Sequence, residues 1–193
     1  MNKNIAIIMG HPDSGSFCSA LAASYEKGAA GQGASVRTID LSRITFDPNL
    51  KHGYHKRTEL ENDLVAAQET IRWADHLVFV YPTWWGTMPA LLKGFIDRVF
   101  LPGFAFKYRK DSVFWDKLLA GKSARLIVTM DTPLWYNRFV YGKPGHRAMK
   151  IATLQFCGIK PVKITEIGSL RTTTEQTRHR WLAKIEKMGS RFA

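Results

Sequence analysis

Two short loops hold the residues whose chemistry best suits a ligand. The first, GHPDSGSF at residues 10–17, places a histidine and two serines directly before a stretch with helical spacing. A helix N-terminus offers unpaired N–H groups and the positive end of a dipole, and hydroxyl groups add donors. His11, Ser14 and Ser16 therefore suit a phosphate. The spacing is equally compatible with a serine that only caps the helix and a solvated histidine.

The second loop, YPTWWG at residues 81–86, joins an apolar run to an amphipathic helix. Adjacent tryptophans in such a loop most often pack into a core or form a lid. A flat apolar ligand would need the same composition, with rings to cover its face and backbone groups to meet its polar edge. The loop after the first strand contains neither G-x-G-x-x-G nor G-K-[ST], which argues against a Rossmann dinucleotide site and a P-loop there.

Alternating strands and helices place both loops at one edge of a sheet. Such alternation predicts an α/β fold, a doubly wound five-stranded parallel sheet with helices on both faces. The nearly apolar strands should be central and the charged ones should be edges, which fits the flavodoxin-like order 2-1-3-4-5. Ligands in such sheets bind beyond the carboxyl ends of the strands. The expected strands are 5–9, 35–41, 77–81, 126–129 and 161–167, and the expected helices include 17–25, 59–74, 148–156 and 174–188.

The composition indicates one basic domain. With 193 residues and 45% hydrophobic content, the chain suits a single domain over residues 1–193. Its 28 Lys and Arg against 16 Asp and Glu give a net charge of +12. Such an excess suits nucleic acid, an anionic membrane surface or a phosphorylated small molecule, and does not choose among them. No nucleic-acid-binding motif accompanies the scattered basic residues.

Simple sequence patterns indicate where the protein is located, how its cysteines behave and whether it binds a metal. The N-terminus has too few apolar residues for a signal peptide or a membrane span, so we expect a cytoplasmic location. Cys18 and Cys157 match no metal spacing and lie in apolar helical patterns, where cysteine behaves as a small buried hydrophobe. His52 and His55 lack carboxylate or thiolate neighbours, so we assign no metal.

Together the two loops resemble a known family. HPDSGSFCSAL and YPTWWGTMPALLKGFIDRVF look like segments of the flavin-dependent NAD(P)H:quinone oxidoreductases of the flavodoxin-like fold, and the similarity extends through GFAFKY and FCG. By position, the resemblance puts the first loop at the flavin phosphate or pyrophosphate and the tryptophan loop along the isoalloxazine ring. The implied cofactor-binding residues are His11, Ser14, Ser16, Phe17, Ala20, Pro82, Thr83, Trp84, Trp85, Gly86, Thr129, Met130 and Asp131.

The chain departs from the family pattern after the fourth strand. The family usually has a Thr-Gly-Gly turn there, followed by a tyrosine and a histidine, whereas this chain has TMDTP at residues 129–133. Tyr136 fits the family tyrosine and is the candidate for orienting the acceptor or supplying a proton. His146 is the second catalytic candidate, with a surface histidine beside a turn as its alternative. We expect Asp131 to face solvent or pair with Arg125 or Arg138, because it would otherwise repel an anionic reduced flavin.

The resemblance implies hydride transfer from NAD(P)H through bound flavin to a quinone-like acceptor, by a ping-pong mechanism. It favours FAD over FMN and leaves NADH and NADPH open. It also implies a homodimer with the site at its interface, for which GFAFKYRK and SVFWDK are candidate interface or lid segments. Two alternatives stay open: a regulatory or accessory subunit of a membrane transporter, and a basic nucleic-acid-binding protein.

Overall fold

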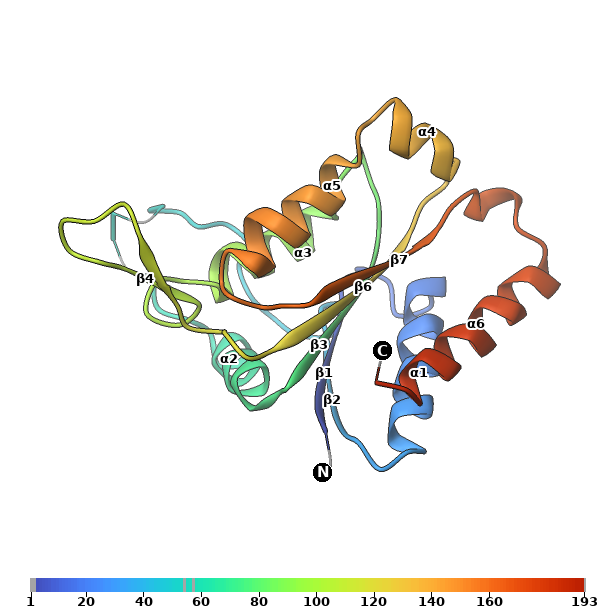
Figure 1. Cartoon of the computed structure of the whole chain (residues 1–193), viewed down its shortest axis with the longest axis horizontal. Coiled ribbons are helices and arrows are strands. Elements are labelled where there is room, and N and C mark those ends of the chain that lie inside the picture. Colours follow the sequence, from blue (N-terminus) through green and yellow to red (C-terminus); the bar gives the residue numbers. More distant parts are fainter. Residues whose placement is uncertain (1–2, 54, 57, 193) are drawn as a thin grey trace.

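A computed structural model describes residues 3–53, 55–56 and 58–192. Its centre is a parallel sheet of five strands in the order β2-β1-β3-β6-β7 (Figure 1). Once the small two-stranded sheet of β4 and β5 is set aside, this is the predicted order 2-1-3-4-5, with the charged strands β2 and β7 at the edges. The strands of the large sheet are β1 (Asn4–Met9), β2 (Ser35–Asp40), β3 (His76–Pro82), β6 (Ser123–Thr129) and β7 (Val162–Ile167).

The two faces of the sheet carry different helices because side chains alternate along each strand. Along β1, Ile5 and Ile7 pack in the cluster with α1 and α6, whereas Ala6 and Ile8 pack in the cluster with α2 and α3. Both clusters are buried, so the central strands are apolar on both faces. The main helices are α1 (Phe17–Ala30), α2 (Asn62–Trp73), α3 (Ala90–Val99) and α6 (Glu175–Gly189).

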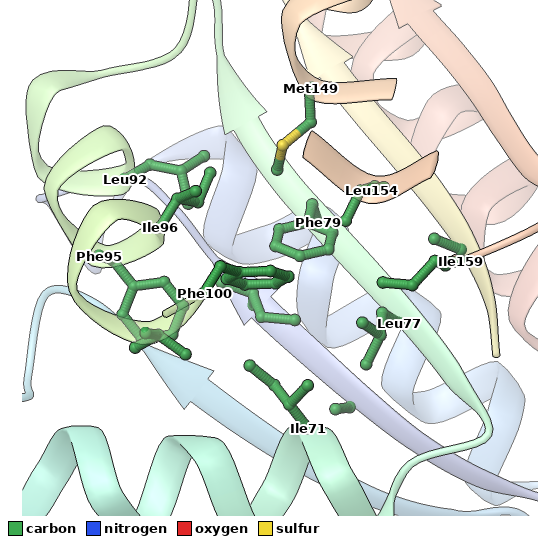
Figure 2. Close-up of a cluster of buried hydrophobic side chains, with 14 of the residues drawn as sticks. Ile71, Leu77, Phe79, Leu92, Phe95, Ile96, Phe100, Met149, Leu154 and Ile159 are labelled. Atoms are coloured by element: carbon green, nitrogen blue, oxygen red, sulfur yellow. The ribbon is translucent and has the colours of Figure 1, made fainter. Parts of the chain in front are cut away.

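The larger cluster fixes α3 and the tryptophan loop that precedes it. Figure 2 shows Phe95, Ile96 and Phe100 pointing from the α3 region toward Leu77 and Phe79 of the sheet. Pro89 is the residue before α3, where its lack of an N–H costs no helical hydrogen bond. The first turn of α3 is therefore held against the sheet directly beside the carboxyl end of β3.

Glycines bring α1 and α6 unusually close together. A Cβ on Gly28 would collide with the backbone carbonyl oxygen of Glu186, and one on Gly189 would collide with that of Tyr25. Because these obstacles are backbone atoms, the two helices can pack at this spacing only with glycine at the crossing. Helices α1 and α6 together cover one face of the sheet, and the first loop leads into α1 on that face.

The region of the candidate interface or lid segments GFAFKYRK and SVFWDK contains a hairpin. Strands β4 (Phe106–Tyr108) and β5 (Trp115–Lys117) pair antiparallel, with Phe106 opposite Lys117. Only Phe106 of β4 is buried, so strands this short give too little alternation to be recognised in the sequence.

The segment after β6 is also more regular than expected. No helix was expected between the strand at 126–129 and the helix at 148–156, but this segment contains helices α4 (Leu134–Phe139) and α5 (Pro144–Arg147). The helix expected at 148–156 is present as η1 (Ala148–Gln155), a wide π-helical segment that continues α5. Neither α4 nor α5 exceeds six residues, so neither establishes a hydrophobic period of its own.

Candidate functional site

The first loop is held by its own side chains. The backbone N–H of Asp13 donates to His11 Nδ1 at 3.0 Å, and that of Gly15 donates to Asp13 Oδ1 at 2.8 Å. Since His11 Nδ1 accepts this hydrogen bond, its neutral ring carries the proton on Nε2. The loop therefore presents His11 as a donor through Nε2 just above the end of β1.

The start of α1 has the donors that an anion needs. Ser16 is the N-cap residue, and its Oγ accepts from the N–H of Ser19 at 3.3 Å. The N–H groups of Phe17 and Cys18 have no acceptor among the described residues. Two first-turn donors thus remain available at the positive end of a 14-residue helix. The prediction that Ser14 or Ser16 caps this helix is confirmed for Ser16.

The tryptophan loop is a tight two-residue turn. Trp84 and Thr87 exchange two backbone hydrogen bonds, of 2.8 and 3.1 Å, and between them Trp85 and Gly86 have φ angles of 50° and 77°. Positive φ at both central positions is typical of a type I′ turn. Glycine adopts this backbone readily, whereas for tryptophan it is strained. The turn leaves the Trp85 side chain fully exposed and Trp84 partly exposed.

Three contacts join the two loops to the end of β6. The rings of His11 and Trp84 meet edge to face with their centroids 5.5 Å apart. The N–H of Thr83 donates to the carbonyl oxygen of Thr129 at 2.7 Å. The buried Cys18 Sγ lies 3.3 Å from Thr129 Oγ1. Thr129 is therefore the point where α1, the tryptophan loop and the sheet come together.

Asp131 lies beside this junction and is exposed. One of its carboxylate oxygens, Oδ1, accepts from the backbone N–H of Arg171 at 2.9 Å. Asp131 thus faces solvent, as expected, but it is not paired with Arg125 or Arg138 in the described structure. Arg125 is buried and donates to Thr165 Oγ1.

A cavity of about 210 Å³ opens between these groups at the carboxyl edge of the sheet. Nine of the thirteen predicted cofactor-binding residues line it, which brings together both loops and the end of β6. Ser14, Ala20, Trp85 and Gly86 are not part of its lining. Sequence reasoning missed three residues of its wall. The lining consists of His11, Ser16, Phe17, Cys18, Pro82, Thr83, Trp84, Thr129, Met130, Asp131, Thr132 and Leu170.

The two catalytic candidates lie outside this lining. Tyr136 is half-buried on α4, where its ring meets the rings of Trp135 and Tyr141. His146 is only 5% exposed, so the alternative of a surface histidine is wrong. Its Nε2 lies 3.5 Å from Glu166 Oε1 and has no hydrogen-bond partner in the described structure.

Glu166, at the carboxyl end of β7, anchors the segment that carries Tyr136. Lys143 Nζ donates to Glu166 Oε2 at 2.7 Å, and Asn137 Nδ2 approaches Oε1 at 3.5 Å. Burial lowers the pKa of His146, while the Glu166 carboxylate acts in the opposite direction and Lys143 reinforces the lowering. One signal of this cluster is visible in the sequence, the charged Glu166 near the carboxyl end of a strand, and we interpreted such charges only as a mark of an edge strand.

Comparison with known proteins identifies the family of the chain. Residues 3–188 match a family model described as flavodoxin-like fold. The chain belongs to this family. A Haemophilus influenzae protein named "Uncharacterized NAD(P)H oxidoreductase" is 31% identical over 186 residues, covering 91% of this chain and 88% of that protein. Human ribosyldihydronicotinamide dehydrogenase [quinone] is 29% identical over 183 residues, covering 82% and 78%.

A solved structure adds a fold comparison. The FMN-dependent NADH-azoreductase of Bacillus anthracis, determined in complex with FMN, has a TM-score of 0.75 at 20% identity and covers 100% of both chains. These comparisons confirm the resemblance to the NAD(P)H:quinone oxidoreductase family and its flavodoxin-like fold.

Neither a metal-binding cluster nor a membrane-spanning helix is present among the described residues. Within the part of the chain that the structure describes, no three His, Cys, Asp or Glu side chains come together where they could hold a metal ion. Every helix among those same residues is too short or too polar to traverse a bilayer.

Proposed function

We propose that the chain is a flavin-dependent NAD(P)H oxidoreductase that transfers hydride from a nicotinamide to a quinone or similar acceptor by a ping-pong mechanism. The observation that carries this proposal is the cavity between the start of α1 and the tryptophan loop. Its donors suit an anion and its walls suit a flat ring, and both occur at the carboxyl edge where doubly wound folds bind ligands. Hydride chemistry is what a bound flavin nucleotide supplies.

The residues of the first loop fit the phosphate of such a nucleotide. The free N–H groups of Phe17 and Cys18 and the hydroxyl of Ser16 surround the positive end of α1. We assign His11, Ser14 and Ala20 to the same end of the ligand, with His11 donating through Nε2. The one acidic side chain of this loop is that of Asp13, and no other side chain there would repel an anion. Asp13 is engaged by the N–H of Gly15.

The tryptophan loop and the end of β6 fit the ring. We assign Pro82, Thr83 and Trp84 to its face and the segment Thr129, Met130 and Asp131 to its polar edge, where charge develops. Trp85 and Gly86 form the turn that sets the position of Trp84. Because the Asp131 carboxylate accepts from Arg171, its charge is partly compensated at the edge of the cavity.

Tyr136 is our candidate for the acceptor side of the site. It lies on α4, which begins two residues after Thr132 of the cavity wall. We propose that its hydroxyl orients the acceptor or supplies a proton. Since His146 is enclosed with Glu166, we assign it a positioning role: together with Lys143 it holds the segment that carries Tyr136.

The finer features of the assignment remain proposals. The cofactor is a flavin nucleotide, and the preference for FAD is not carried over, because the flavin of the Bacillus anthracis structure is FMN. The exposed Tyr108, Val113 and Phe114 of the β4–β5 hairpin support a homodimer with the site at its interface. The cytoplasmic location stays a prediction.

Steady-state kinetics of the flavin-loaded protein test this function. With NADH or NADPH varied against a water-soluble quinone, a ping-pong enzyme gives parallel double-reciprocal lines. Tyr136→Phe should lower kcat/KM for the quinone by about tenfold or more and leave that for the nicotinamide nearly unchanged, because only the acceptor half uses the hydroxyl. If neither nicotinamide is oxidised by protein with its flavin bound, the proposal is wrong.

A further inference from the structure

The wall of the candidate cavity differs in charge from the rest of the chain. The chain carries a net charge of +12, yet no lysine or arginine is among the described residues that line the cavity. Burial raises the pKa of Cys18 to about 11, so the thiol in this wall stays neutral. Asp131 contributes the only carboxylate of the lining. The wall of the cavity in a basic protein is therefore acidic at one point.

Backbone hydrogen bonds hold Asp131 at the rim of the cavity. The preceding residue, Met130, donates through its N–H to the carbonyl oxygen of Ile167 at 2.9 Å. The carbonyl oxygen of Met130 accepts from the N–H of Leu170 at 3.1 Å. Asp131 Oδ1 itself accepts from the N–H of Arg171 at 2.9 Å. The carboxylate is thus tied to the segment after β7 and is not carried by a freely moving side chain.

The hydrogen bond from Arg171 does not remove the charge of Asp131. Its donor is a neutral peptide N–H, and Asp131 takes part in none of the ion pairs of the described residues. The guanidinium of Arg178, on α6, lies instead over the ring of Phe17, 5.6 Å from the ring centroid. A negative charge without a paired cation therefore stands at the edge of the cavity.

We infer that the Asp131 carboxylate lowers the reduction potential of the bound flavin, an inference that rests on the proposed function. Hydride brings two electrons and one proton to N5 of the ring. The neutral oxidised ring then becomes an anion, with its charge shared between N1 and the C2 carbonyl oxygen. A fixed negative charge at the polar edge of the ring destabilises this anion and has little effect on the neutral form. The reduced flavin is therefore a stronger hydride donor.

This role distinguishes the chain from the pattern that it otherwise resembles. At the two positions after Thr129 the resembling family usually has glycines, which carry no side chain that could act on the ring. This chain has Met130 and Asp131 there. The charge at this edge is thus a property of this chain's own residues.

A purely structural role is the main alternative for Asp131. Its carboxylate would then serve only to hold the backbone of Arg171, and its charge would have no effect on the ring. The side-chain amide of asparagine also has an oxygen that can accept this hydrogen bond. Asp131→Asn therefore removes the charge and keeps the structural contact, so the two roles predict different results.

Spectroelectrochemical titration of the flavin-loaded protein tests the inference. At a fixed applied potential, the ratio of reduced to oxidised flavin should be about tenfold higher in Asp131→Asn than in the wild-type protein, a rise of about 30 mV for a two-electron couple. Asp131→Glu keeps the charge, so its potential should stay near the wild-type value. Because Asp131 is exposed, both variants should keep the wild-type melting temperature.

Asp40→Asn is the matched control for the loss of one negative charge. Asp40 ends β2 at the same edge of the sheet, and its Oδ1 accepts from the backbone N–H of Ser42 at 3.0 Å. It does not line the cavity, and it is paired with Arg43. Its potential should therefore stay close to that of the wild-type protein. Equal rises in Asp40→Asn and Asp131→Asn would overturn the inference, as would an unchanged potential in Asp131→Asn.

Stopped-flow kinetics provide a second test, which a disturbed fold would not imitate. In Asp131→Asn the reduction of the flavin by a nicotinamide should be faster and its reoxidation by a quinone slower. The two changes have opposite directions because the same charge opposes the arrival of hydride on the ring and favours its departure. Slowing of both half-reactions would show a structural disturbance and would overturn the inference.

The failure of this inference differs from the failure of the proposed function. A protein that binds no flavin would contradict both. A bound flavin whose potential does not depend on the charge of Asp131 would contradict only the role of Asp131, and it would leave the oxidoreductase proposal intact.

Discussion

The two halves of the candidate site are held together in different ways. The loops after β1 and β3 are fixed by short-range contacts: the Asp13 N–H to His11, the turn at Trp84 and Thr87, and the cap at Ser16. The segment after β6 is fixed mainly from a distance by Glu166, which reaches it from β7. The first half is encoded within each loop, and the second depends on residues far along the chain.

This difference explains why one half was predictable. A cap and a helix start leave local signals in the sequence, and our prediction of Ser16 rests on such a signal, whereas Thr83 and Trp84 were assigned from the family resemblance of the loop that holds them. The burial of His146 depends on Glu166, twenty positions later, and no local pattern shows it. The same reasoning predicted the sheet order but missed α4, α5 and the β4–β5 hairpin.

The largest expected effect on stability comes from removing the charge of Glu166, which holds the segment after β6. Glu166→Gln removes the charge that Lys143 meets at 2.7 Å while both side chains are largely shielded. We expect a loss of about 2 kcal/mol in the free energy of unfolding, between the values for exposed and buried pairs. Urea denaturation measures it.

The exposed pair Lys27–Glu186 is the control for that variant. Glu186→Gln should cost less than about 0.5 kcal/mol, because an ion pair in contact with water contributes little. If the two variants lose the same stability, Glu166 is not the anchor described here.

A second variant tests the contact between the halves. A Cβ on Gly145 would lie 2.8 Å from the carbonyl oxygen of Gly86 in the tryptophan turn. Gly145→Ala should therefore displace that turn, costing about 1.5 kcal/mol of stability, and weaken flavin binding. Gly31→Ala, at a helical φ of −62°, is the control and should be nearly neutral. Unchanged flavin affinity in Gly145→Ala would show that the halves are independent.

A third variant separates capping from ligand binding in the first half. Ser16 and Thr174 are both N-cap residues whose hydroxyls accept from an N–H at 3.3 Å. Alanine at either position should cost about 1 kcal/mol of stability. Only Ser16→Ala should also weaken flavin binding, by about tenfold, because only that helix faces the cavity. Equal flavin affinities in the two variants would remove Ser16 from the site.

The smallest expected effect is a pH dependence confined to the second half. Burial lowers the pKa of His146 in the folded chain. A lowered histidine pKa means that the unfolded chain binds more protons, so this stability is fully present above the ordinary pKa near 6.5 and is lost as the pH falls below it. The protection of the α4 amides, measured as the intrinsic exchange rate divided by the observed rate, should fall on acidification from pH 7 to pH 5 more than that of the tryptophan turn. The difference should vanish in His146→Gln.

The account depends most directly on flavin binding between the start of α1 and the tryptophan loop. Quenching of flavin fluorescence, titrated with FMN and with FAD, measures this for the wild-type protein and for Ser16→Ala and Thr174→Ala. We expect at least one nucleotide to bind one per chain, with affinity lowered in Ser16→Ala alone. A wild-type protein that binds neither nucleotide at saturating concentration would contradict the account.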